Sequence, residues 1–497
     1  LWLVGFAGSG LGLPRIAHAQ FNQLGGVEPT GQYPSQLYYT GLQIYRDGDL
    51  AQAVNAFEGA LRSSRRDING RWVDAIPALA MLAECHWHMG DLVTTREYVD
   101  HVFQIAIRNR GWLGRTDWQS VLITATRSQP SGLWPEANAV RVLPVADRIM
   151  YRSGNPLTAQ ALVQGGPIEE QNVRTMDVVE MMRGLAIASY RRRALLGPLA
   201  EQDPLAVGLL EATKYPAGLQ IPVARSLIAS VRTTGYLTNH DDKRALAEGA
   251  NSVTVNGGVH PLSVINMLSQ ASAIAGTDKS DAVVPLAMNM VHSAAALRQP
   301  ELIGEALQLA AGCANQSQAA VVRQAASTVA TALIRKSRLA TLHSLIAGAD
   351  AAITAGDVAS AANMLNQAQS LTARRDVLQP RLEAYGAYVA ARLAAARGSS
   401  IGLDSDTDLD QAIDSIQSFA LNHRSRKKSL VSMPRVYQLG LIRQAIGTSV
   451  GGTTSDILLK AYCDDPAADV WRRDAVDGLA ASMLDRSIAH AAVSYTH

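Results

Sequence analysis

The residues best suited to bind a metal stand together in the stretch Cys85-His86-Trp87-His88. Thiols and imidazoles are the usual zinc ligands in proteins. The flanking pattern predicts a helix, however, and residues two apart on a helix point to different faces. His86 and His88 therefore cannot grip one ion together, and we expect no metal site here.

Four aspartates alternate near the C-terminus: Asp404, Asp406, Asp408 and Asp410. Carboxylates at alternate positions are typical of calcium-binding loops, but this stretch lacks the central glycine and the closing glutamate of an EF-hand. We interpret 399–407 as a solvated insertion, after which Asp408 caps the next helix.

Several common catalytic signatures are missing from the sequence. No GxxxxGK[ST] or HExxH pattern occurs, and no GxGxxG follows a predicted strand. The three cysteines, Cys85, Cys313 and Cys463, stand far apart and provide neither a disulfide framework nor a CxxC metal pair. We therefore predict no catalytic residues and no cofactor.

Two basic runs, Arg191-Arg192-Arg193 and residues 424–428, are the strongest local concentrations of charge. They lack interleaved aromatic residues, and the net charge of the whole chain is only +2. Cations are favoured at the C-terminal ends of helices. We interpret both runs as solvated helix ends and predict no nucleic-acid partner.

The composition predicts a large folded core. Of 497 residues, 47% are apolar and 18% are charged, which excludes wholesale disorder, and the length allows two to four domains. From residue 169 onward, runs rich in Ala, Leu, Val, Met and Gln are broken by Gly or Pro at helix-length intervals. No stretch shows convincing strand alternation, and we interpret 253–255 as part of a loop. The predicted class is all-α.

Two helical hairpins in tandem, over 35–108, organise the N-terminal part. They turn on Gly48-Asp49-Leu50 and Gly90-Asp91-Leu92. Glycine ends a helix without strain because it adopts the left-handed conformation. Aspartate begins the next helix well because its carboxylate accepts a bond from a free amide. Each Gly-Asp pair therefore predicts a helix–turn–helix unit.

The first hairpin resembles the tetratricopeptide repeat (TPR) family, whose spacing it matches at Gly41, Gly48, Ala53, Phe57 and Ala60. The second hairpin matches it only partly. The signature returns at Gly356-Asp357, and the stretch from Asp408 to Ala412 echoes the one from Asp49 to Ala53. The resemblance implies an α-solenoid of antiparallel helical hairpins that forms a right-handed superhelix.

The same resemblance implies a ligand groove on the concave face. Tyr38, Leu42 and Tyr45 lie on a different helical stripe from the packing residues Leu37, Gly41 and Ile44. In the TPR family the corresponding face holds an extended or helical peptide. The predicted groove residues are Tyr38, Leu42, Tyr45, Arg46, Glu84, Trp87 and His88. The alternative is that these side chains pack against 20–34 or against the segment from Trp112 to Trp134.

The first 19 residues resemble a secretory signal peptide. Residues 1–13 are apolar and small, and Ala17-His18-Ala19 follows them. A short apolar run before Ala-x-Ala predicts cleavage after Ala19 and is too short to span a bilayer. We expect a periplasmic or secreted protein, with 20–34 as a flexible lead-in.

The remaining chain divides into three predicted regions. Residues 35–151 hold the first hairpins and a Trp-rich irregular segment, 168–336 hold degenerate helical repeats, and 337–497 hold C-terminal TPR-like repeats. Breaks at Pro156 and Gly165-Gly166-Pro167 mark the first boundary.

These features favour an exported, non-enzymatic scaffold that binds a protein or peptide partner through a concave groove. One alternative is the accessory region of a larger exported enzyme that continues past His497. A less favoured alternative is an all-α toroid acting on polysaccharide, which needs paired carboxylates in an aromatic-lined cleft. Aromatic residues become sparse after residue 151, and no clear carboxylate pair stands out.

Overall fold

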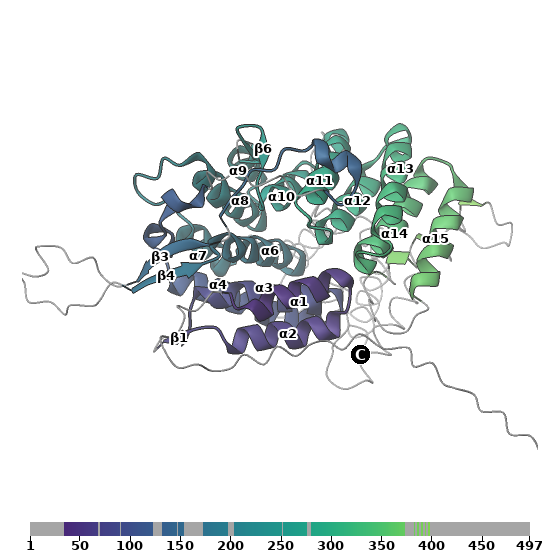
Figure 1. The fold of residues 1–497 in the computed structure, drawn as a ribbon. Coiled ribbons are helices and arrows are strands. Elements are labelled where there is room, and N and C mark those ends of the chain that lie inside the picture. The colour runs from purple at the N-terminus through teal and green to yellow at the C-terminus, as the bar shows by residue number, and fades with distance from the viewer. Residues whose placement is uncertain are drawn as a thin grey trace, which may run out of the picture.

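The computed structural model describes residues 34–67, 70–89, 91–122, 132–146, 148–153, 172–196, 203–250, 252–275, 280–372 and single positions between 382 and 397. Within these residues the chain is mostly helical (Figure 1), which agrees with the predicted all-α class. The predicted signal peptide, most of the lead-in, Gly90, Asp408 and Ala412 lie outside the described residues.

Two sets of helices alternate along the chain. The inner set comprises α1 (Gln36–Asp47), α3 (Ile76–His88), α6 (Val178–Leu196), α8 (Pro222–Thr238), α10 (Ser263–Ala275), α12 (Glu301–Cys313) and α14 (Arg338–Thr354). The outer set comprises α2 (Leu50–Arg62), α4 (Leu92–Arg108), α7 (Pro204–Ala212), α9 (Asp242–Gly249), α11 (Val283–Ala296), α13 (Gln316–Leu333) and α15 (Val358–Thr372).

Gly-Asp pairs connect α1 to α2, α3 to α4 and α14 to α15, because glycine ends one helix and aspartate caps the next. Gly48 adopts a left-handed backbone (φ 93°), and its N–H bonds the carbonyls of Ile44 and Tyr45. The Asp49 carboxylate then accepts a hydrogen bond of 3.0 Å from the Gln52 amide. Asp91 and Asp357 cap α4 and the start of α15 in the same way.

The first hairpin packs through small residues facing one aromatic ring. Ala53 and Phe57 of α2 are fully buried, and a Cβ added at Gly41 would lie 2.9 Å from the Phe57 ring. The predicted packing stripe needs correction at Leu37, which is 44% exposed. Helix α1 instead buries the Tyr38 stripe because neighbouring helices lie on that side.

Enlarging Ala53 is therefore expected to push the two helices apart. We expect Ala53→Leu to lower the free energy of unfolding by about 1–3 kcal/mol, the usual cost of overpacking a filled core. Urea denaturation measures this loss, with Ala51→Leu, at an exposed position of the same helix, as the matched control. Equal stability of the two variants would contradict the packing.

Within the residues that the structure describes, three short antiparallel strand pairs interrupt the helices, and the sequence analysis missed them. They are β1 (Arg66–Asp67) with β2 (Gly70–Arg71), β3 (Ile149–Ser153) with β4 (Asn172–Met176), and β5 (Thr254–Val255) with β6 (Gly258–Val259). The loop predicted at 253–255 is wrong, because Asn256 and Gly257 both adopt positive φ, as a tight hairpin turn requires.

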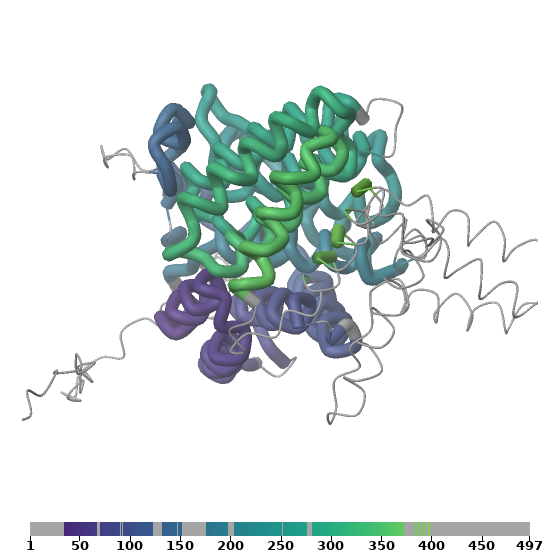
Figure 2. The backbone as a smooth tube through the Cα atoms, turned by 90° about the vertical axis from the view of Figure 1, so that its right-hand side faces the viewer, coloured from purple at the N-terminus to yellow at the C-terminus, as the bar shows by residue number. Residues whose placement is uncertain are grey.

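The inner helices form a closed circuit of contacts. Each packs against the next in the order α1, α3, α6, α8, α10, α12 and α14, and α14 packs back against α1. Figure 2 shows the N-terminal helices lying beside the C-terminal ones, although about three hundred residues separate them in sequence. The outer helices lie around this circuit, each against its inner neighbours.

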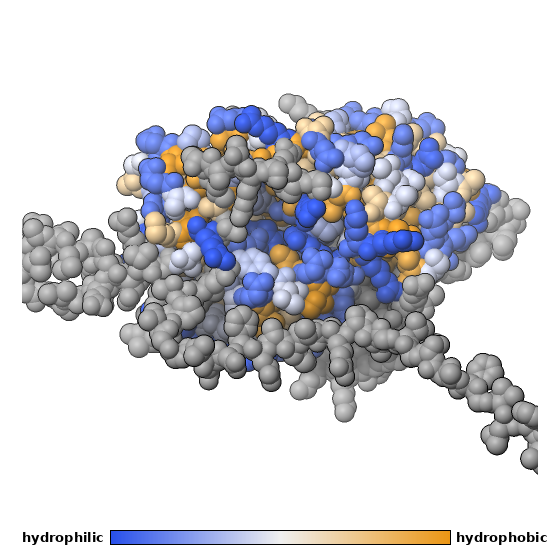
Figure 3. All heavy atoms as spheres, in the orientation of Figure 1, coloured by the Kyte–Doolittle hydropathy of each residue, from blue (hydrophilic) through white to orange (hydrophobic). Residues whose placement is uncertain are grey.

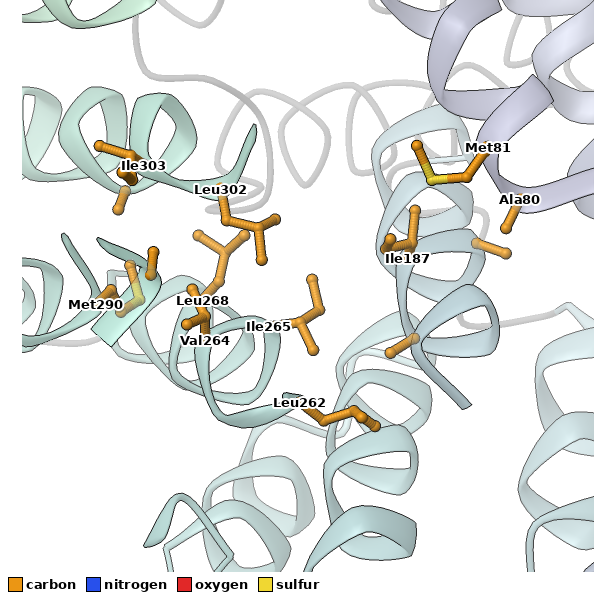
Figure 4. Packing of buried hydrophobic residues seen from close by; sticks show 14 of the residues in the cluster. Ala80, Met81, Ile187, Leu262, Val264, Ile265, Leu268, Met290, Leu302 and Ile303 are labelled. Atoms are coloured by element: carbon orange, nitrogen blue, oxygen red, sulfur yellow. The ribbon is translucent and has the colours of Figure 1, made fainter. Parts of the chain in front are cut away.

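Most buried apolar side chains of the described residues form one core, from Tyr38 to Leu393, and a small second cluster contains Leu237, Ala245 and Ala273. Figure 4 shows the middle of the core, where Ile187 of α6 lies between Ala80 and Met81 of α3 on one side and Ile265 of α10 on the other. Helix α6 is buried on almost every face. It therefore acts as the hub against which several hairpins pack.

Candidate functional site

The structure brings the predicted groove residues together, but it places them in the interior. Tyr38, Leu42, Tyr45, Glu84, Trp87 and His88 are each at most 6% exposed. Only the Arg46 side chain, 21% exposed, reaches solvent. The face expected to hold a peptide is covered by helices α6 and α12 of the same chain, so it is not an open groove.

Arg191 of α6 stands at the centre of this interior face. Its guanidinium donates to both carboxylate oxygens of Glu84, at 2.5 and 2.9 Å, and to Glu305 at 2.9 Å. The cation also lies 4.9 Å from the centre of the Trp87 ring. Burial opposes its charge, but Glu305 and Glu84 raise the pKa of Arg191 well above its usual value.

Arg183 forms a second centre two turns earlier on α6. It donates to Glu180 at 3.0 Å and to the Tyr38 hydroxyl at 3.2 Å, and it lies 3.5 Å from Glu301. Burial alone would raise the pKa of Glu180, but the Arg183 guanidinium holds it below its usual value. Burial and the nearby Glu180 charge raise the pKa of Tyr38.

Arg46 links α1 to α12 and to the start of α14. Its guanidinium makes two hydrogen bonds of 3.1 Å to Glu301 of α12. The Arg46 carbonyl accepts a bond of 2.6 Å from the hydroxyl of Ser337, which caps α14. We call the two clusters together the central ion network: Arg46, Glu180, Arg183 and Glu301 form one cluster, and Glu84, Arg191 and Glu305 form the other.

The prediction that the basic run Arg191-Arg192-Arg193 is a solvated helix end is wrong. All three consecutive arginines are at most 4% exposed. Arg192 bonds Asp203 and Asp100, whereas Arg193 bonds the Leu237 carbonyl and Asp242. Three consecutive residues of a helix point in three different directions. On α6 each of the three arginine side chains therefore contacts different neighbouring segments.

The central ion network is arranged to hold helices together. Each of its four glutamates accepts a bond from, or lies in salt-bridge contact with, an arginine of the set. At Glu180 the Arg183 guanidinium lowers the pKa of the carboxyl, which is the opposite of what a general acid needs. Sequence analysis missed Glu180, Arg183, Glu301 and Glu305, although their i,i+3 and i,i+4 spacing inside apolar runs was a usable signal.

A serine–histidine pair lies beneath a hollow of about 480 Å³ between α8 and α9, with Ser226 in its lining. The Ser226 hydroxyl is 2.9 Å from Nε2 of His260. His260 Nδ1 accepts a bond from the Leu262 amide, which leaves the proton on Nε2, facing the Ser252 carbonyl at 2.9 Å. This tautomer cannot take the serine proton, so the pair is structural.

The thiol and metal chemistry of the described residues is equally limited. Burial raises the pKa of the Cys85 thiol well above its usual value, which suppresses its reactivity. His86 contacts Asp91 and His88 contacts Glu84, so the two imidazoles face different partners. The described residues contain no group of three or more His, Cys, Asp or Glu side chains placed to hold a metal.

One sequence pattern with catalytic potential falls outside the described part of the chain. Residues 447–451 read Gly-Thr-Ser-Val-Gly, which fits the GxSxG pattern around the nucleophile of many serine hydrolases. The prediction that the sequence contains no GxSxG signature is therefore wrong. The pattern bears directly on whether the chain is an enzyme.

A second hollow of about 280 Å³ opens between α13 and α15, with α14 as its floor. Exposed polar side chains form its walls, and Ala330, Leu345 and Met364 form a buried apolar floor. We call it the outer groove. Elsewhere, on the face seen in Figure 3, apolar side chains are scattered among polar ones.

A scan against protein-family models gives no match, and a search of curated protein sequences gives no match either. Among the described helices, none combines the length and the apolar character needed to cross a membrane.

Proposed function

We propose that this chain is an exported, non-enzymatic helical-repeat scaffold of TPR-like hairpins that binds a protein partner. In this proposal the hairpins form one continuous α-solenoid, and the central ion network holds α1, α3 and α12 to the central helix α6. The observation that carries the proposal is that network. Its residues on the inner face of α1, α3, α6 and α12 bond one another, so this face stabilises the fold and is not open to a partner.

A rigid ring of this kind presents its outer helices to a partner. The outer layer repeats one helix per hairpin around the circuit, and such repetition suits recognition of an extended surface. The outer groove lies in this layer. The buried carboxylates and the structural Ser226–His260 pair give no support to catalysis within the described residues.

Photo-crosslinking tests where the partner binds. A photoreactive phenylalanine would replace one exposed residue on each outer helix: Ala51, Glu97, Val207, Lys243, Asn289, Thr331 and Gln367. After irradiation in the exported fraction of the source cell, we expect neighbouring positions to crosslink one discrete protein, whereas distant positions do not. Absence of any adduct from all seven positions would contradict the scaffold.

An esterase assay tests the enzymatic alternative directly. We expect the full chain and its Ser449→Ala variant to hydrolyse p-nitrophenyl esters no faster than buffer. Hydrolysis that the substitution abolishes would make the chain an enzyme. Incubation with polysaccharides, followed by a search for cleaved products, applies the same test to the toroid alternative.

Export has its own test. Mass spectrometry of the protein recovered from the exported fraction is expected to find an N-terminus at Gln20, because cleavage follows Ala19 in the predicted signal. Recovery only from the cytoplasm, with residues 1–19 retained, would contradict this part of the proposal.

A further inference from the structure

The outer groove has the make-up of a peptide-binding surface. Ser327 and Thr331 stand one turn apart on α13, and Asn363 and Gln367 stand one turn apart on α15. All four are exposed. Side-chain amides and hydroxyls can donate to and accept from a peptide backbone at the same time, while the apolar floor can receive side chains.

The dimensions favour an extended chain. The lining contributed by α13 and its C-cap runs from Arg323 to Ile334, a length of roughly 16 Å at the helical rise per residue. An extended peptide covers that length with about five residues. The length of the groove therefore suits a short extended segment.

The charge around the groove favours an acidic partner. From residue 316 to 372 the chain carries four basic residues, Arg323, Arg335, Lys336 and Arg338, against two aspartates. Asp350 is buried and bonds Tyr385, and Asp357 is paired with Arg323. Arg335, Lys336 and Arg338 lie where α13 ends. Lys336 donates to the Leu133 carbonyl and Arg338 to the Leu371 carbonyl, and neither of these two contacts neutralises a charge.

Exposed features at that end complete the surface. Ile334 lines the groove and is 57% exposed. Arg335, which follows it, is exposed and has no carboxylate partner among the described residues. Arg338 donates to the Leu371 carbonyl, which places the end of α13 beside the end of α15.

From these observations we propose that the outer groove binds an extended, acidic peptide segment of a partner protein. The acidic side chains lie toward the basic end formed by Arg335, Lys336 and Arg338, and the apolar side chains lie on the floor. The inference rests on the proposed scaffold function and assigns it a site and a partner class.

A randomised heptapeptide library displayed on phage, selected on the full chain, supplies the probe. We expect selected peptides to be rich in Asp and Glu, with apolar residues between them. Their binding should weaken as salt screens the charges. Ser327→Trp, which fills the groove, and Arg335→Glu, which reverses a charge, should each weaken binding at least about fivefold.

Matched controls locate the effect. Thr328→Trp adds the same ring one residue along α13, at an exposed position outside the groove lining, and Lys243→Glu reverses an exposed charge on α9. Both should leave binding unchanged. Basic or uncharged selected peptides, or equal binding to the Ser327→Trp variant, would overturn the inference.

The outcome separates this inference from the scaffold itself. One possible result is that outer positions other than Thr331 and Gln367 crosslink a partner while the library yields no acidic peptides. This result would contradict the assignment of the outer groove but would still support the scaffold. Failure of both experiments would remove both.

Discussion

Replacing Arg191 by methionine is expected to destabilise the protein by about 3–5 kcal/mol, because it leaves buried charge without its partner. Glu84 and Glu305 are both at most 6% exposed, and both bond this one guanidinium. Methionine fills similar space but neutralises neither carboxylate. Since whole domains are stable by only about 5–15 kcal/mol, urea denaturation should show a large shift of the midpoint.

Two further variants separate charge from packing. Arg62→Met removes an exposed arginine that pairs with Glu58, and such surface pairs contribute at most about 1 kcal/mol. Adding Glu84→Gln and Glu305→Gln to Arg191→Met should restore part of the lost stability, because the unpaired charges are then gone. A loss under about 1 kcal/mol for Arg191→Met would contradict the network's role.

Acidification from pH 7 to pH 4 is expected to remove about 3 kcal/mol of stability through His260 alone. Burial lowers the pKa of His260 to about 4, whereas an unfolded histidine titrates near pH 6.5. The unfolded chain therefore takes up a proton first as the pH falls. The stabilising effect is complete above about pH 6.5 and is lost progressively down to about pH 4.

The surroundings of His260 explain why it stays neutral. Ser226, the Ser252 carbonyl and the Leu262 amide face the ring, and no carboxylate contacts it among the described residues. Glu180 and Asp91, whose pKa values are lowered in the fold, lose their stabilising effect only below about pH 4. Their transition is therefore distinct from that of His260.

Unfolding measured at several pH values tests this assignment. His260→Gln should flatten the change in stability between pH 6.5 and pH 4, because glutamine keeps a donor for Ser252 but does not titrate. His292→Gln, at an exposed position, should leave the slope unchanged. An unaltered slope in His260→Gln would show that other groups cause the loss.

Local chemistry could be predicted from the sequence where it is decided within a few residues. The Gly48-Asp49 junction and the burial of Phe57 depend on capping and on small residues at helical spacing, so they are visible in the sequence. The β5–β6 turn was also local, and a more consistent use of the Asn256-Gly257 signal would have found it.

Whether the predicted groove residues are exposed or buried depends on contacts between segments far apart in the sequence. Tyr45 and Trp87 are aromatic residues on a helix face, a pattern that fits a binding groove and a buried core equally well. What decides between them is Arg191, about a hundred residues away. The sequence alone did not reveal that three consecutive arginines would all be buried and would pair with carboxylates on different hairpins.

Native-state hydrogen exchange, followed by mass spectrometry at low urea concentrations, tests the central claim that the inner face is closed. If the central ion network holds α3 and α6 together, their amides should exchange only through global unfolding. Exchange of both helices through a smaller opening, while the outer helices stay protected, would mean that the inner face opens as a groove. The partner would then bind where Tyr45 and Trp87 lie.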